Sequence, residues 1–247
     1  MPAYRAPQSD IGRLAFMSKT IKAATIDQAQ GLSYVDANLL TDPSAFVELY
    51  NAYNAAHIQV ESAIGKRVGE TAESNAALDK LRMYISHLWI SVTNRARRLG
   101  LSAAVFRMYK LNSDGSRPVI NGNEELLTIA PQIIAGDAEA VAAGFAPVAE
   151  PSTAELQAVL DSAIAESTDV IAADRKVDVA QAALAAFRPQ ADEMIADVRA
   201  SILYNTRKMD APSQRRILRS HGATFRYLPN EPIDEGDVAP EVVEPTA

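Results

Sequence analysis

The sequence has no cysteine, one tryptophan and three histidines, and aromatic residues make up only 6% of its 247 positions. The absence of cysteine excludes disulfide bonds, thiolate metal sites and a cysteine nucleophile. No stretch approaches the ~18 consecutive apolar residues of a membrane-spanning helix, so we expect no membrane insertion. The N-terminus lacks the basic and then apolar layout of a signal peptide. This predicts a cytoplasmic protein, with export by a route that needs no cleaved signal as the alternative.

Glycine is also scarce, with 11 residues, whereas alanine is abundant and apolar residues reach 48%. This composition favours helices over strands. The length is sufficient for one large or two small hydrophobic cores. The net charge of −7 argues against a dedicated nucleic-acid-binding protein, because phosphate backbones attract basic proteins.

Two long segments carry apolar residues at spacings of mostly three and four, which is the pattern of a packed helix. Each begins after a Pro-Ser pair, with Ser44 and Ser152 as the expected N-caps. The seam residues of the first segment are Phe46, Leu49, Tyr53, Ala56, Val60, Ala63, Leu78, Leu81, Ile85, Leu88, Val92 and Leu99, and those of the second are Leu156, Leu160, Ala163, Val170, Leu184, Phe187, Ala191, Met194 and Val198.

The two segments also match each other as an internal repeat. Residues 78–92 align with residues 184–198 at an offset of 106, and residues 49–64 align with residues 156–171 at an offset of 107. Repeats of this length are typical of stacked supersecondary units.

The one-residue change of offset bears on the course of each helix. Inside a continuous helix it would rotate the following apolar stripe by ~100°. We therefore expect each half to be an antiparallel hairpin with a break near residues 65–72 or 172–178, and two very long helices are the alternative. Pro189 also predicts a kink near residues 185–189.

These patterns predict an all-α fold: two pseudo-repeated antiparallel helical hairpins packed as an elongated four-helix-type bundle with short accessory helices. The expected segments are an N-terminal arm at 1–42 with a helix from Ile11 to Ala24 capped by Asp10, a first hairpin plus short helix at 43–118, an acidic connector at 119–151 with a short helix that stops at Gly136, a second hairpin plus short helix at 152–227, and a disordered acidic tail at 228–247.

Motifs for catalysis and for cofactor binding are missing. A di-iron bundle needs Glu-x-x-His on two helices, and this motif does not occur. His57 and Glu61 lie four residues apart, but we interpret them as a surface pair. Neither a Gly-x-Ser-x-Gly nucleophile elbow nor a phosphate-binding Gly-rich loop is present. We therefore expect no enzyme activity, no cofactor and no metal; a hydrolase or metalloenzyme would need a site that the sequence does not display.

Two groups of basic residues recur at corresponding places in the two halves and are interleaved with aromatic residues. They can cap helix C-termini, contact a neighbouring subunit, or bind phosphate backbones. The candidate interaction residues are Arg95, Arg97, Arg98, Arg107 and Lys110, which we call the first basic cluster, and Arg207, Lys208, Arg215, Arg216, Arg219 and Arg226, which we call the second.

Three further stretches are Tyr50-x-x-Tyr53-x-x-Ala56 followed by Thr71-Ala-Glu-Ser-Asn-Ala-Ala-Leu-Asp-Lys-Leu81, then Gly136-Asp-Ala-Glu-Ala-Val-Ala-Ala-Gly144, then Arg216-x-x-x-x-His221-Gly-x-x-x-Arg226-Tyr-Leu-Pro. These resemble stretches of uncharacterised bacterial proteins built from alanine-rich helical hairpins, some of which carry fibronectin type III modules. The resemblance covers most of residues 45–230. It implies a non-enzymatic surface or assembly role and transfers no functional residue.

Charge is segregated along the chain. No lysine or arginine occurs from Val119 to Ala173, where there are nine carboxylates, and the tail from Glu231 adds six more. Blocks of opposite sign favour head-to-tail association between copies. The sequence therefore predicts a non-enzymatic structural protein that self-associates into an oligomer or polymer through its terminal arms and charged surfaces. The alternative is an anion or nucleic-acid adaptor that uses the two basic clusters.

Overall fold

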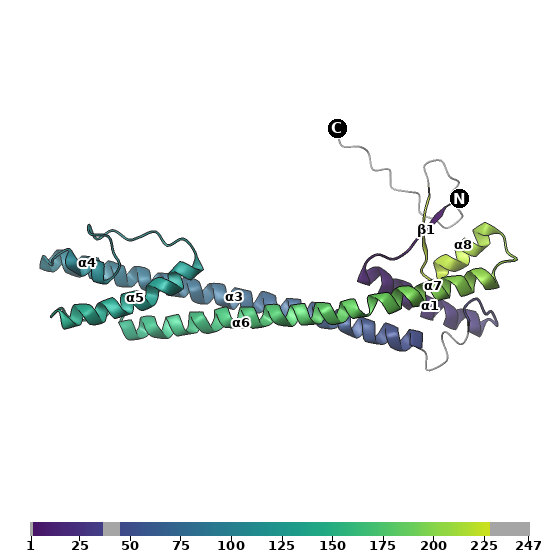
Figure 1. Ribbon diagram of the computed structural model, residues 1–247, viewed down its shortest axis with the longest axis horizontal. Helices are drawn as coiled ribbons and strands as arrows, with labels where there is room; N and C mark the ends of the chain where they lie inside the picture. The colour runs from purple at the N-terminus through teal and green to yellow at the C-terminus, as the bar shows by residue number, and fades with distance from the viewer. Residues whose placement is uncertain (1, 37–44, 228–247) are drawn as a thin grey trace, which may run out of the picture. The chain divides into compact units, whose positions relative to one another are not determined.

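A computed structural model describes residues 2–36 and 45–227, and it is mostly helical with one small sheet (Figure 1). The all-α prediction is therefore confirmed. The chain divides into two compact units. Unit 1 comprises Met1–Glu61 and Val179–Ala247, and unit 2 comprises Ser62–Asp178. Among the described residues, no helix combines the length and the apolar character that crossing a membrane requires.

Unit 1 is a helical core closed by a two-stranded antiparallel sheet that the sequence did not predict. In the sheet Tyr4 lies opposite Phe225, and the two rings meet edge to face with their centroids 6.2 Å apart. The elements of unit 1 are β1 (Ala3–Arg5), α1 (Asp10–Ala29), the first part of α3 (Ala45–Leu99), the last part of α6 (Thr153–Ala186), α7 (Arg188–Asn205), α8 (Ala211–Ser220) and β2 (Thr224–Arg226).

The described part of the N-terminal segment packs into unit 1 rather than forming a free arm. Leu14, Phe16 and Met17 of α1 are buried in its core. The helix is longer than expected, and its N-cap is Ser9, whose hydroxyl accepts a hydrogen bond from the Gly12 N–H. Residues 37–44, with the proposed cap Ser44, and residues 228–247, expected to be a disordered tail, lie outside the described residues.

Unit 2 has its own hydrophobic core, in which the predicted seams are buried. Its elements are the rest of α3, α4 (Ala104–Met108), α5 (Asn123–Ala142) and α6 up to Asp178. Leu99 is wrong as a seam residue, because it is 60% exposed, and the expected seam residues Ala63 and Val170 are only half-buried. The buried core includes Leu78, Leu81, Ile85, Leu88 and Val92 of α3, Leu126, Ala130 and Ile133 of α5, and Leu156, Leu160 and Ala163 of α6.

The predicted hairpin breaks at residues 65–72 and 172–178 are wrong, because α3 and α6 are continuous there. Gly65 and Gly69 are the residues that suggested the first break. Each glycine costs an exposed helix about 1 kcal/mol relative to alanine, and starting a new helix costs a nucleation step as well. Because strong helix formers surround both glycines, one continuous helix has a lower free energy than two helices joined by a turn.

The expected kink near Pro189 is a full helix boundary. Helix α6 ends at Ala186, and α7 begins at Arg188 with Pro189 in its first turn, where the missing proline N–H breaks no helical hydrogen bond. Phe187 between them stacks on Tyr53 with ring centroids 5.7 Å apart. The first half of the presumed repeat is thus one helix and the second half is two, so the helices do not reproduce the repeat as hairpins.

Gly136 lies inside α5 and does not end it, contrary to the expectation. A Cβ at this position would lie 1.7 Å from the carbonyl oxygen of Met108. The glycine therefore permits α5 to approach the backbone of α4 closely. Pro131 is also accommodated within α5, which continues to Ala142.

Candidate functional site

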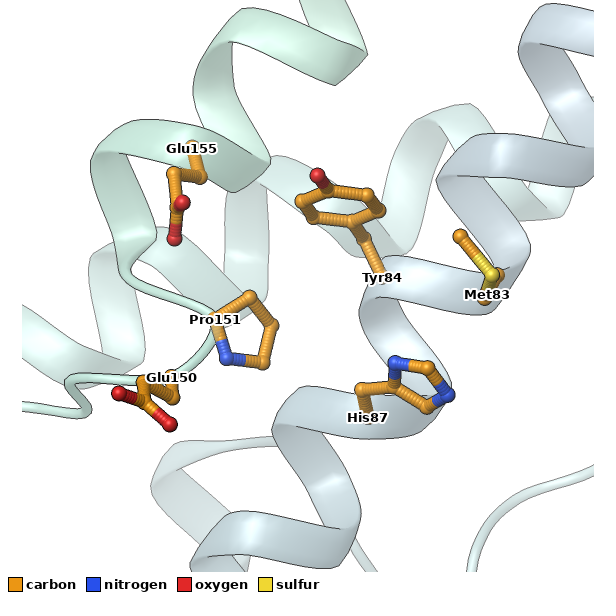
Figure 2. Close-up of a pocket in the computed structure, with 6 residues that line it drawn as sticks. All are labelled: Met83, Tyr84, His87, Glu150, Pro151 and Glu155. Carbon is orange, nitrogen blue, oxygen red and sulfur yellow. The ribbon is translucent and has the colours of Figure 1, made fainter.

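A pocket in unit 2 lies where α3 faces the beginning of α6. Its volume is about 370 Å³, and it is lined by Met83, Tyr84, His87, Glu150, Pro151 and Glu155. Figure 2 shows Tyr84 across from Pro151 and Glu155, with Met83 and His87 on the same stretch of α3 and Glu150 beside the proline. This volume is near the lower end of the roughly 300–1,000 Å³ that is typical of small-ligand pockets.

Glu155 in this pocket is also part of a capping box. Its Oε2 accepts the backbone N–H of Ser152 at 2.8 Å and the Ser152 hydroxyl at 3.0 Å, while the Glu155 N–H donates to that hydroxyl at 3.2 Å. The expected N-cap at Ser152 is therefore correct. The two hydrogen bonds from Ser152 hold the pKa of the Glu155 carboxyl below its usual value, so this side chain carries its negative charge at neutral pH.

Within unit 2, α3 and α6 form an antiparallel pair joined by polar contacts. The Arg67 guanidinium donates to the Asp174 carboxylate, and the hydroxyls of Ser74 and Ser167 lie 3.4 Å apart. Moving seven residues forward along α3 therefore moves seven residues back along α6. Of the α3 residues from Ser62 to Ala77, only Ser74 is buried, so this part of the pair has little apolar core.

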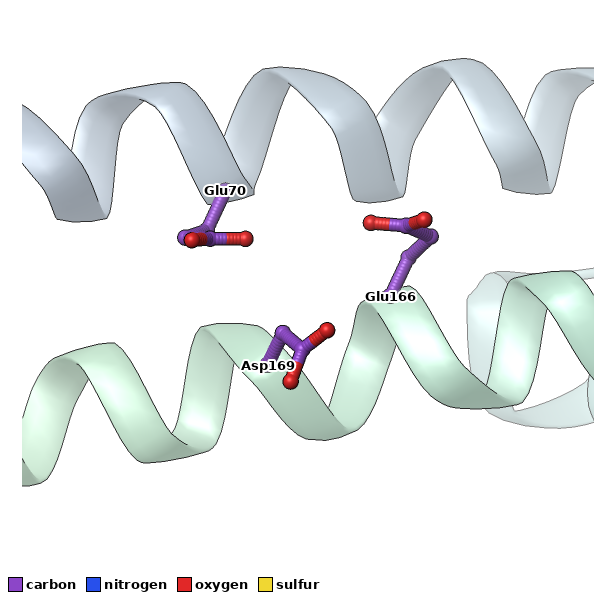
Figure 3. Close-up of side chains that lie close together, drawn as sticks. All are labelled: Glu70, Glu166 and Asp169. Carbon is purple, nitrogen blue, oxygen red and sulfur yellow. The ribbon is translucent and has the colours of Figure 1, made fainter.

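A carboxylate cluster occupies one side of this pair. Glu70 of α3 and Glu166 and Asp169 of α6 bring carboxylate oxygens within 4.8 Å of one another (Figure 3). An oxygen-only set of this kind suits a hard divalent cation such as Ca²⁺ or Mg²⁺. The cluster is partly exposed, and nothing else at these residues points to a ligand, so we assign no metal to it.

The opposite side of the same pair carries four exposed aliphatic side chains. A helix turns by about 100° per residue, which places Ile64 and Val68 on the flank of α3 away from Glu70, and Ile164 and Ile171 on the flank of α6 away from Glu166. Because the helices are antiparallel, these two flanks lie on the same side of the pair. We call these four residues the apolar side; their exposed fractions are 36%, 63%, 47% and 54%.

The first basic cluster lies in unit 2, and one of its members has a structural role. Arg95 donates from one nitrogen to the carbonyls of Ala146 at 2.5 Å and Pro147 at 3.0 Å, which ties α3 to the loop before α6. The other four members, namely Arg97, Arg98, Arg107 and Lys110, are exposed.

The second basic cluster lies in unit 1, and its arginines use the neighbouring aromatic rings. The Arg207 guanidinium lies 4.1 Å from the Tyr204 ring centroid, and that of Arg219 lies 5.2 Å from the Phe225 centroid. These cation–π contacts occupy ring faces that the adaptor hypothesis would use to stack bases. Lys208, Arg216 and Arg226 are exposed, and Arg215 is half-buried.

One histidine has partners that resemble a catalytic triad. His221 is fully buried, with Nε2 3.3 Å from Asp27 Oδ2 and Nδ1 3.3 Å from the Ser220 hydroxyl. However, Nδ1 lies 2.9 Å from the Ile217 carbonyl, and the Ser220 hydroxyl donates to the same carbonyl at 2.7 Å. A carbonyl only accepts, so Nδ1 carries a proton and is no base for Ser220. We interpret the group as a buried structural contact between α1 and α8.

A second polar network in unit 1 centres on the half-buried Asp10. The Tyr53 hydroxyl donates to Asp10 Oδ1 at 2.7 Å, and Arg188 donates to both carboxylate oxygens at 2.8 and 2.9 Å. The Arg188 hydrogen bonds lower the pKa of Asp10 against the opposing effect of burial. Burial and the bond to Asp10 raise the pKa of Tyr53 to about 12. Asp10 thus joins helices rather than capping α1.

Comparisons of the chain with protein-family models, with curated proteins and with solved structures found no match. The resemblance to alanine-rich helical-hairpin proteins therefore stays an expectation from short stretches, and the case for a function rests on the geometry of the chain itself.

Sequence reasoning missed both the pocket and the carboxylate cluster. Glu70 and Glu166 are 96 residues apart and carry no motif, and only the antiparallel pairing of α3 and α6 brings them together. The pocket had one local signal, the Ser152-x-x-Glu155 capping box. That pattern marks a helix start, which says nothing about a ligand.

Proposed function

We propose that this chain is a non-enzymatic structural protein that self-associates, and that a second copy docks on the apolar side of the α3–α6 pair. The observation that carries the proposal is the presence of Ile64, Val68, Ile164 and Ile171, all exposed, on one side of the stretch of the pair where α3 buries only Ser74. Exposed apolar side chains that share one face with polar residues around them are typical of protein–protein contacts.

A second copy of the same chain suits this surface for two reasons. A two-helix pair becomes a four-helix cross-section when it meets its own copy, and such a bundle buries the apolar stripes of all four helices. A two-fold axis also brings the same patch onto itself, which is the commonest symmetry of homo-oligomers. The carboxylate cluster disfavours the opposite side, because burying unpaired like charges is costly.

Sedimentation equilibrium of the full chain tests the proposal. We expect an average mass above that of the 26.6 kDa monomer that rises with concentration, and a monomer for the double variant Ile164→Lys, Ile171→Lys. Val119→Lys is the matched control, because Val119 is 76% exposed in the same unit but outside the apolar side. A wild-type monomer at every concentration, or a double variant that assembles normally, would contradict the proposal.

Salt separates this contact from the charge-driven one that the sequence suggested. An apolar interface persists at high ionic strength, whereas contacts between acidic and basic blocks weaken as salt screens them. We therefore expect the average mass at 1 M NaCl to equal or exceed that at about 0.1 M. Dissociation by salt would assign the association to the two basic clusters and the acidic segments instead.

A further inference from the structure

We propose that the pocket between α3 and the start of α6 binds an alkylammonium group, either a free amine or a lysine side chain. The pocket has two carboxylates, an aromatic ring and apolar side chains, and its lining contains no lysine or arginine. This inference does not depend on self-association, because the pocket and the apolar side share no residue.

The negative charge of the pocket favours a positively charged ligand. Glu150 and Glu155 contribute two negative charges from the loop and the first turn of α6 (Figure 2). Glu155 is held in place by Ser152 through one oxygen, Oε2, and Oε1 takes no part in these capping bonds. Ser91 fixes the Glu150 main chain by donating to its carbonyl at 2.6 Å. The Glu155 carboxylate and the main chain at Glu150 are therefore in position before any ligand arrives.

The remaining walls suit an alkyl chain and a cation next to a ring. Met83 and Pro151 provide apolar contact, and methionine adapts to ligands of differing shape. Tyr84 is half-buried between α3 and α6. The face of a tyrosine ring attracts ammonium groups. An alkylammonium ion combines these features, since its charged end meets the carboxylates and its chain meets the apolar wall.

A metal ion fits the pocket less well, although His87 and two carboxylates are common ligands. Among the described residues, only Glu70, Glu166 and Asp169 place three such atoms within 4.8 Å of one another. The ligand atoms of His87, Glu150 and Glu155 are therefore too far apart to hold one ion together. An ammonium group does not need three converging ligands, because one carboxylate and the face of a neighbouring ring are enough to bind it.

The test is a titration of the full chain, labelled with ¹³C at its methionine methyl groups, with butylammonium chloride. The chain has six methionines, and Met83→Leu assigns the pocket signal. We expect a saturable shift of the Met83 methyl with a Kd on the order of 1 mM, while Met209, an exposed methionine in unit 1, stays unshifted. A second arm uses N-acetyl-lysine-methylamide, and tighter binding of that compound identifies a lysine side chain as the preferred source of the group.

Matched controls isolate the role of charge. The neutral isostere 1-butanol should leave the Met83 methyl in place, and Glu150→Gln, Glu155→Gln should weaken butylammonium binding at least tenfold. Glu139→Gln is the control for charge, because it removes an exposed carboxylate of α5 that does not line the pocket; it should bind within threefold of wild type.

Four results would overturn the proposal. They are an unmoved Met83 methyl, an equal response to 1-butanol, unchanged affinity in the double Gln variant, and a loss of affinity in Glu139→Gln as large as that in the double Gln variant.

Discussion

Arg13 of α1 donates two parallel hydrogen bonds to Asp192 of α7, from Nε to Oδ1 at 2.7 Å and from a terminal nitrogen to Oδ2 at 2.9 Å. Arg13 is buried and also donates to the Gln8 carbonyl at 3.1 Å. The Asp192 side chain is half-exposed. The bidentate pair ties α1 to α7 within unit 1.

We expect Arg13→Lys and Asp192→Asn each to lower the free energy of unfolding by about 1–2 kcal/mol, because lysine cannot reproduce the planar fork and the half-exposed carboxylate limits the gain. Urea denaturation measures this effect. The double variant should cost less than the sum of the two single changes. Full additivity would show that the two residues do not act together.

The Tyr53–Asp10 bond predicts a loss of stability at high pH. The pKa of Tyr53 is raised from 10.0 to about 12 in the folded chain, so between these values the unfolded tyrosine has released its proton while the folded one has not. The stabilisation is complete below about pH 10 and is lost as the pH rises through the folded pKa. We expect the stability difference between wild type and Tyr53→Phe to shrink by about 1–2 kcal/mol between about pH 9 and pH 11.5.

Urea denaturation at each pH gives this difference directly, and subtracting the Tyr53→Phe curve removes the titration of the other tyrosines. A difference that stays constant across this range would show that Tyr53 does not titrate differently in the folded and unfolded chains.

Replacing glycine by alanine should have opposite effects on stability at Gly136 and at Gly69. Gly136→Ala places a Cβ 1.7 Å from the Met108 carbonyl oxygen, so we expect a cost of about 3 kcal/mol as α4 and α5 separate. Gly69→Ala meets nothing within 4 Å and should stabilise continuous α3 by about 0.5–1 kcal/mol. Thermal unfolding of both variants checks the pair. Destabilisation by Gly69→Ala would favour a turn at that position after all.

Removing one charge from the carboxylate cluster should raise the thermal stability of the protein, by an amount that depends on salt. Glu166→Gln removes one of three like charges, so we expect the unfolding temperature to rise at low salt and the gain to fade by 1 M NaCl, where the Debye length is about 3 Å. Glu139→Gln, at an exposed position on α5 outside the cluster, is the control and should change little. A lower unfolding temperature for Glu166→Gln would mean that the three carboxylates do not repel one another.

The sequence alone predicts the helical class and most of the buried seam, because both depend on local spacing. Leu78, Leu81, Ile85, Leu88 and Val92 recur at intervals of three and four, and all of them are buried in unit 2. The same local logic finds the Ser152 cap and the interruption at Pro189. These features need only the geometry of one helix.

Only the tertiary structure decides which residues meet across the chain. Gly136 has the same local signal as a helix terminator, but its role depends on the backbone of α4 coming close to it. The sequence predicts Asp10 as a helix cap, but in the structure its carboxylate accepts hydrogen bonds from Tyr53 and Arg188. The pocket and the apolar side arise from the antiparallel register of α3 and α6. Such register is set by packing between distant segments, and one sequence shows the pattern of each segment but not its partner.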